Sequence, residues 1–81
     1  MSVEQKVRGY ILESFLFTDD DSALNNADSL LENGTMDSTG VMEVIHFLEE
    51  EFGITVEDEE MVPENLDSVD NIVAFVKRKT Q

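Results

Sequence analysis

Residues 38–52 carry the pattern that most constrains the fold of this chain. At about 100° per residue, five apolar side chains of this run fall within an arc of about 100°, as in a helix with one buried face. Asp37 or Ser38 is expected to cap the helix, because either side chain can accept hydrogen bonds from the free first-turn amides. Gly53 is expected to end it, since glycine adopts a left-handed backbone at little cost. The residues predicted to face the core are Val41, Val44, Ile45, Leu48 and Phe52.

The opposite face of this predicted helix is exposed and adjoins Ser38. Phe47 lies at the border between the two faces. Because the exposed face is rich in glutamate, it can attract basic protein surfaces. The residues predicted to lie on it are Met42, Glu43, His46, Glu49 and Glu50.

Two other runs also have helical spacing, at residues 3–16 and 69–79. Ser2 is expected to cap the first of these helices and Ser68 the second. In the second helix, an acid near the start and three bases in the last turn match the helix dipole at both ends. The last helix is predicted to turn Val69, Ile72, Val73 and Val76 inward, with Phe75 at an edge.

A long polar connection is expected at residues 18–36, between the first two helices. A loop of this length in a small domain is usually functional or packed. Leu24, Leu30 and Leu31 are therefore expected to pin it to the core, and residues 29–32 to form a helical turn.

The segment after the second helix completes the predicted fold. Residues 54–56 are β-like, but one short segment without a partner strand cannot make a sheet, so we expect an extended linker whose Ile54 and Val56 fill the core. Glu57–Val62 are expected to form a short helix that ends at Pro63. Together these elements predict an all-α fold, a small four-helix bundle with three main helices, one short helix and a long first loop. We expect residues 1–81 to form a single domain.

The distribution of charge limits the partners of the chain. Its 19 acidic residues and five Lys and Arg give a net charge of −14. No Lys or Arg lies between Gly9 and Val76, where all the acidic residues except Glu4 stand. Such a field repels nucleic acid and anionic membranes and attracts basic proteins. No run approaches the ~20 apolar residues of a membrane span, and residues 1–20 lack the form of a signal peptide, so a cytoplasmic monomer is expected.

The known motifs for catalysis, metal binding and nucleotide binding are missing from the sequence. Cysteine is absent, and the single histidine, His46, follows Ser38 by eight positions, or about 12 Å along a helix, too far to act as its base. Gly34–Ser38 lacks the flanking glycines of a nucleophile elbow. The calcium-loop pattern that begins at Asp19 fails at its fifth and sixth positions, and no glycine-rich phosphate loop is present. We therefore expect neither enzymatic activity nor a metal site.

Ser38 itself allows two interpretations. A serine before an amphipathic helix is most often an N-terminal cap. The same position also suits a phosphate ester, because the free amides and the positive end of the helix dipole favour a negative group there. The serine alone leaves both interpretations open.

The residues around Ser38 resemble the acyl carrier protein family. The likeness rests on Ser29–Ser38, which ends in Asp37-Ser38, and on the run Leu-Glu-Glu-Glu-Phe-Gly-Ile at Leu48–Ile54, and it covers essentially the whole chain. The resemblance implies that Ser38, next to Asp37, carries a 4′-phosphopantetheine group attached from coenzyme A by a phosphopantetheinyl transferase. It further implies that the terminal thiol of this group holds acyl groups as thioesters.

The resemblance also implies how such a carrier meets its partners. The exposed face of the second helix would dock on basic patches of the transferase and of acyl-activating, acyl-transfer or synthase enzymes. An acyl chain could be sheltered in the bundle, although the same side chains can equally be ordinary core residues. These candidate lining residues are Val41, Ile45, Leu48, Phe52, Ile54 and Val73.

Two positions depart from the usual pattern of the family. Thr39 stands where the family usually has leucine, and Gly40 where an acidic residue is frequent. We therefore expect a carrier of a specialised lipid or secondary pathway. The alternatives are an aminoacyl or peptidyl carrier, and an acidic helical interaction module that is not modified.

Overall fold

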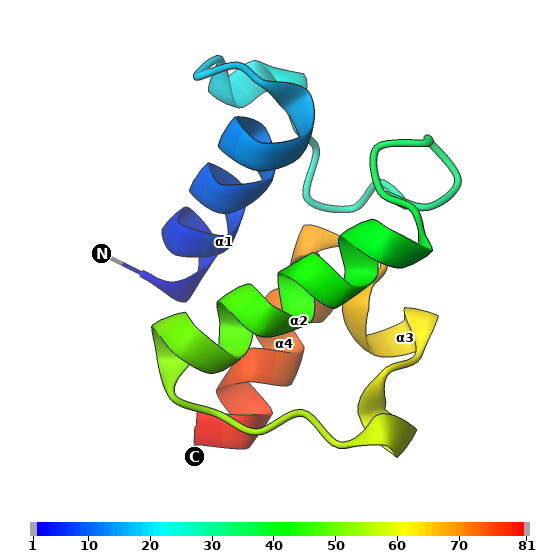
Figure 1. Cartoon of the computed structure of the whole chain (residues 1–81). Coiled ribbons are helices and arrows are strands. Elements are labelled where there is room, and N and C mark those ends of the chain that lie inside the picture. Colours follow the sequence, from blue (N-terminus) through cyan, green and yellow to red (C-terminus); the bar gives the residue numbers. More distant parts are fainter. Residues whose placement is uncertain (1, 81) are drawn as a thin grey trace.

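The computed structural model describes residues 2–80, and within them the chain is helical and has no β-strand. This confirms the predicted all-α class. A π-helical turn, η1, extends the first helix, and two short 3-10 turns, η2 and η3, lie in the connections (Figure 1). The elements in chain order are α1 (Val3–Ile11), η1 (Leu12–Leu16), η2 (Asp21–Ala23), α2 (Ser38–Phe52), η3 (Asp58–Glu60), α3 (Pro63–Leu66) and α4 (Val69–Thr80).

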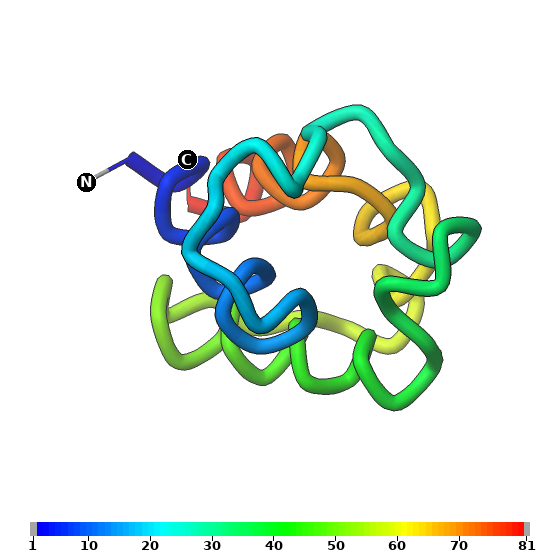
Figure 2. Tube along the Cα trace, turned by 90° about the horizontal axis from the view of Figure 1, so that it is seen from above, coloured from blue at the N-terminus to red at the C-terminus, as the bar shows by residue number. Residues whose placement is uncertain are grey.

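The helices enclose one apolar core. Helix α4 packs against α1, α2 and α3, and Figure 2 shows the helices and the long first loop surrounding a common centre. Each fully buried aliphatic or aromatic side chain contributes about 1.5–3 kcal/mol relative to exposure. The largest fully buried side chains are Phe75, Ile11, Leu30, Leu48, Leu66, Ile72, Val7, Val44, Val69 and Val76.

No helix among residues 2–80 is both long enough and apolar enough to cross a membrane.

The predicted first helix is confirmed, but its end is not α-helical. Ser2 caps α1 as expected, accepting a hydrogen bond from the Gln5 amide at 3.1 Å while the Gln5 side chain accepts one from the Ser2 amide. The last residues of the predicted helix form the π-helical turn η1. Phe17 ends it with a left-handed backbone, φ 54°.

The long loop at residues 18–36 is pinned to the bundle by Arg8, a residue that was not predicted as an anchor. Its guanidinium donates to the Asp21 carboxylate at 3.0 Å, to the Leu24 carbonyl at 3.0 Å and to the Asn26 side chain. The predicted anchor Leu24 is buried. The Arg8 guanidinium therefore holds the acidic loop against α1.

A second tie holds the later part of the loop. The Asp67 carboxylate accepts from the Ser29 hydroxyl at 2.6 Å and from the Leu31 amide at 3.0 Å. The Asn33 amide bonds the Ser29 carbonyl, so the predicted helical turn is present. Leu30 is buried as predicted, and Leu31 is half-buried.

The segment before α4 corrects one prediction. Glu57–Val62 do not form a helix beyond the 3-10 turn η3, and Pro63 begins helix α3 instead of ending one. Proline suits the first helical position, because its missing N–H is not needed there and its φ is already helical. Val56 is buried and Ile54 half-buried in an extended linker, as predicted.

Helix α4 confirms its cap and corrects its buried face. The Ser68 hydroxyl accepts from the Asn71 amide at 3.1 Å. Phe75, expected at an edge, is fully buried, and Val73, expected inward, is half-buried. Helical spacing alone allows either Val73 or Phe75 to lie beside the buried stripe of α4. With α1 and α3 packed on α4, Phe75 is the one that is buried.

Candidate functional site

Ser38 is the first residue of α2, and its side chain is exposed to solvent. Asp37 is the cap: its carboxylate accepts from the Gly40 amide at 2.8 Å, with an extended backbone at φ −118° and ψ −171°. The choice between the two caps is thereby decided for Asp37, which leaves the Ser38 hydroxyl without that task. A negative group on this hydroxyl would lie beside the first-turn amides and the positive end of the helix dipole.

Gly40 fixes the start of α2 in place. It is buried, and a Cβ at this position would lie 2.9 Å from a Phe15 ring carbon and 2.9 Å from Met36 Cγ. The absence of a side chain therefore lets η1 and the end of the loop close directly on the turn that follows Ser38. This glycine is one of the two departures from the usual pattern of the family, and the close approach supplies its physical reason.

An apolar cleft opens beside Ser38, between the loop, α2 and α3. Its volume is about 230 Å³, and the fully buried Leu66 lies at its wall. Of the residues expected to shelter a cargo, Val41 lines this cleft, whereas Ile45 and Leu48 are buried in the core. The complete lining is Leu31, Ser38, Val41, Met42, Met61, Val62, Pro63 and Leu66.

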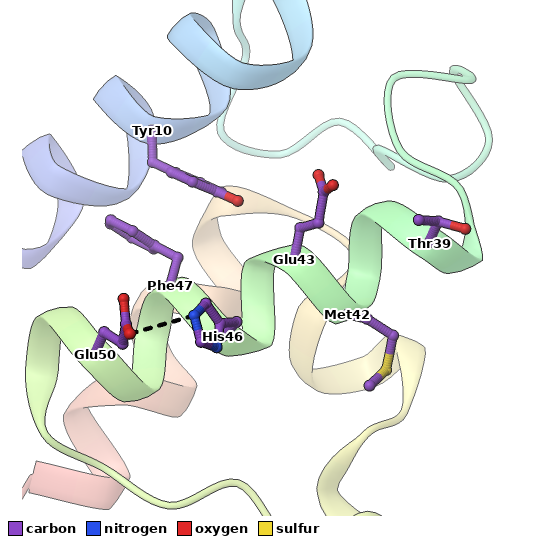
Figure 3. A pocket seen from close by; sticks show the side chains of 7 residues that line it. All are labelled: Tyr10, Thr39, Met42, Glu43, His46, Phe47 and Glu50. Carbon is purple, nitrogen blue, oxygen red and sulfur yellow. Dashed lines mark ion pairs between the residues drawn. The ribbon is translucent and has the colours of Figure 1, made fainter.

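A groove of about 430 Å³, separate from the cleft, lies on the exposed side of α2 (Figure 3). Met42, Glu43, His46 and Glu50, all predicted for this face, are exposed and line it. His46 Nε2 lies 3.3 Å from Glu50 Oε1, one helical turn along. In Figure 3, Met42 points toward α3, on the other side of α2 from Glu43, so it borders both this groove and the cleft beside Ser38.

Three residues that were not predicted for the groove also line it: Thr39, Tyr10 and Phe47. Tyr10 of α1 stacks on Phe47 of α2, with ring centroids 4.1 Å apart and planes inclined by 11°. Burial and the nearby Glu43 carboxylate raise the pKa of Tyr10 above the ordinary value of a phenol. The position of Phe47 at the border of the two faces was the available signal, whereas the contact with Tyr10 depends on how α1 meets α2.

Glu49 differs from the other predicted members of the exposed face. Its side chain is half-buried, does not line the groove, and accepts a hydrogen bond from the Val56 amide at 3.0 Å. The carboxylate therefore ties the linker after α2 back onto the helix. Helical spacing placed Glu49 on the surface but could not show that the chain returns across it.

Comparison with known proteins agrees with this arrangement. A family model described as "Phosphopantetheine attachment site" matches residues 6–76 of the chain. The acyl carrier protein of Buchnera aphidicola subsp. Baizongia pistaciae (strain Bp) is 32% identical over 77 residues, which cover 95% of this chain and 94% of that protein. The chain therefore belongs to the acyl carrier protein family, whose members share a phosphopantetheine attachment domain.

Proposed function

We propose that Ser38 is the attachment residue for 4′-phosphopantetheine, and that the protein carries acyl groups as thioesters between enzymes of a specialised lipid or secondary pathway. The observation that supports this most directly is the exposed Ser38 hydroxyl at the start of α2, next to an apolar cleft, with Asp37 already serving as the cap. The prosthetic group, when bound, supplies the thiol that this cysteine-free chain lacks.

The residues around Ser38 fit such a group. The hydroxyl is open to solvent, so an incoming phosphate can reach it. The first-turn amides of α2 favour a phosphodiester there. The cleft lined by Val41, Met42 and Leu66 offers apolar contacts close to the attachment point. The chain thus provides the anchoring oxygen and a surface for the cargo, and we assign the bond-making chemistry to its partners.

We assign the groove on α2 to partner docking. Glu43 and Glu50 give it negative charge, and the exposed Met42 gives it an apolar contact. Basic patches on the phosphopantetheinyl transferase and on acyl-activating, acyl-transfer or synthase enzymes complement this surface. Charge of this kind mainly accelerates association. Glu49, tied to Val56, is assigned a structural part instead.

Intact mass measurement tests the attachment. The protein is incubated with coenzyme A and a broad-specificity transferase, and we expect a gain equal to one phosphopantetheine. Ser38→Ala should abolish the gain, while the matched control Ser22→Ala, at another exposed serine, should keep it. If several transferases leave the mass unchanged, the protein is the unmodified acidic interaction module instead.

The cargo class needs a separate measurement. The protein is purified from its native host and treated with neutral hydroxylamine, which cleaves thioesters. Release of a fatty or other carboxylic hydroxamate supports the acyl carrier. Release of an amino-acid hydroxamate would assign the chain to the aminoacyl or peptidyl carriers.

A further inference from the structure

Phe17 presents an aromatic ring to solvent at the end of η1. Two large apolar side chains are exposed in residues 2–80: Phe17 at 84% and Met42 at 56%. Met42 belongs to the groove and the cleft described above, but Phe17 lines neither. The ring therefore serves neither the core nor the proposed attachment site.

The backbone at Phe17 makes this exposure notable. Among the described residues it is the one non-glycine residue with positive φ, a conformation that favours glycine. The Leu12 carbonyl holds this conformation by accepting from the Phe17 amide and, at 3.1 Å, from the Thr18 amide. These bonds are made by the main chain and do not need the ring. Backbone preference therefore does not account for a phenylalanine at this position, and such a residue is a candidate for a role outside the fold.

The surroundings of the ring are acidic. Phe17 borders an open depression of about 850 Å³ that Glu13 and Asp19 also line. Asp20 is the next residue along the chain, and hydrogen bonds from the Ser22 hydroxyl and amide lower the pKa of its carboxyl below the ordinary value. Arg8 of α1 is bonded to the Asp21 carboxylate of the loop, and its side chain is only 12% exposed.

We propose that Phe17 and its acidic rim, formed by Glu13 and Asp19, are a second docking surface, separate from the proposed attachment serine, for a basic partner protein. The matching surface of that partner is an apolar socket flanked by Lys or Arg. An aromatic anchor with a polar rim is the usual form of an interaction hot spot. A second copy of this chain is disfavoured as the occupant by the net charge of −14, and an anionic membrane by the same field.

The test uses the full chain with Ser38→Ala, so its outcome does not depend on modification of the serine. A helical peptide of Leu and Lys serves as the probe, and a Lys-only peptide of equal charge as its control. We expect the amide NMR signals of residues 13–20 to shift with the Leu-Lys peptide and less with the Lys-only one. Phe17→Gly should weaken binding at this surface at least about tenfold.

Two further measurements separate docking from folding. Phe17→Gly should keep or raise the melting temperature, because glycine suits the left-handed backbone. Met42→Ala, the matched control at the other exposed apolar residue, should leave the signals of residues 13–20 responsive. Unshifted signals, unchanged affinity of Phe17→Gly or a lower melting temperature would each overturn the proposal. So would sedimentation that shows a dimer for the parent chain and a monomer for Phe17→Gly.

Discussion

Gly40 links the packing of the bundle to the position of Ser38. Its Cα lies so close to the Phe15 ring and the Met36 side chain that there is no room for a methyl group. Helix propensity alone would favour alanine over glycine by about 1 kcal/mol. Overpacking a filled site costs about 1–3 kcal/mol, so packing should outweigh propensity.

Gly40→Ala is therefore expected to lower stability by about 1 kcal/mol, or the melting temperature by about 4–8 °C in a domain of this size. Thermal unfolding followed by circular dichroism measures the change. Phe15→Leu should offset part of the loss, because a smaller, flexible side chain can yield to the new methyl group. A melting temperature that rises in Gly40→Ala would show that the contact with Phe15 adapts freely.

At the scale of the element, two glutamates of α2, Glu43 and Glu49, differ in their burial and in their contacts. Glu43 is exposed in the groove, whereas the Glu49 carboxylate bonds the Val56 amide from a half-buried position. A hydrogen bond to a charged group contributes about 1.5–3 kcal/mol when buried, and less when solvent competes for it. An exposed charge away from such contacts changes stability by at most about 0.5 kcal/mol.

We expect Glu49→Ala to lower the free energy of unfolding by about 1 kcal/mol and Glu43→Ala to leave it unchanged. Urea unfolding measures this difference. The rate of modification by the transferase at low salt should show the reverse order, with Glu43→Ala slower because the docking field is weakened. If Glu49→Ala keeps full stability and docks as slowly as Glu43→Ala, both residues belong to the docking surface.

An element could be predicted where the residues that determine it are its neighbours in the sequence. The bounds of α2, the Ser2 and Ser68 caps and the Gly53 end depend on nearby residues, and all were predicted. Helix α3 was missed because Pro63 is compatible with either ending or beginning a helix. The Tyr10–Phe47 stack and the contact of Phe15 with Gly40 depend on where distant segments meet, which spacing cannot reveal.

At the scale of the whole molecule, negative charge opposes the compact state. In residues 2–80, Lys and Arg form ion pairs with three of the 19 acidic side chains: Glu51, Asp21 and Glu60. The Lys79 ammonium lies 2.8 Å from Glu60 Oε1, and this hydrogen bond lowers the pKa of Glu60. Most of the other carboxylates repel one another through solvent, where salt screens them over about 8–10 Å.

Added salt should therefore stabilise this protein instead of weakening it. If screening removes about 1 kcal/mol of repulsion, the melting temperature should rise by about 4–8 °C between low and physiological ionic strength. Magnesium should act more strongly than sodium at equal ionic strength, because divalent ions gather more closely at dense negative charge. The double variant Asp58→Asn/Glu59→Gln, which neutralises two exposed acids, should melt higher at low salt and respond less to added salt. Thermal scans across a salt series measure both effects. A melting temperature that changes with neither ion would mean that repulsion between carboxylates contributes little to stability. The acidity would then serve partner recognition alone.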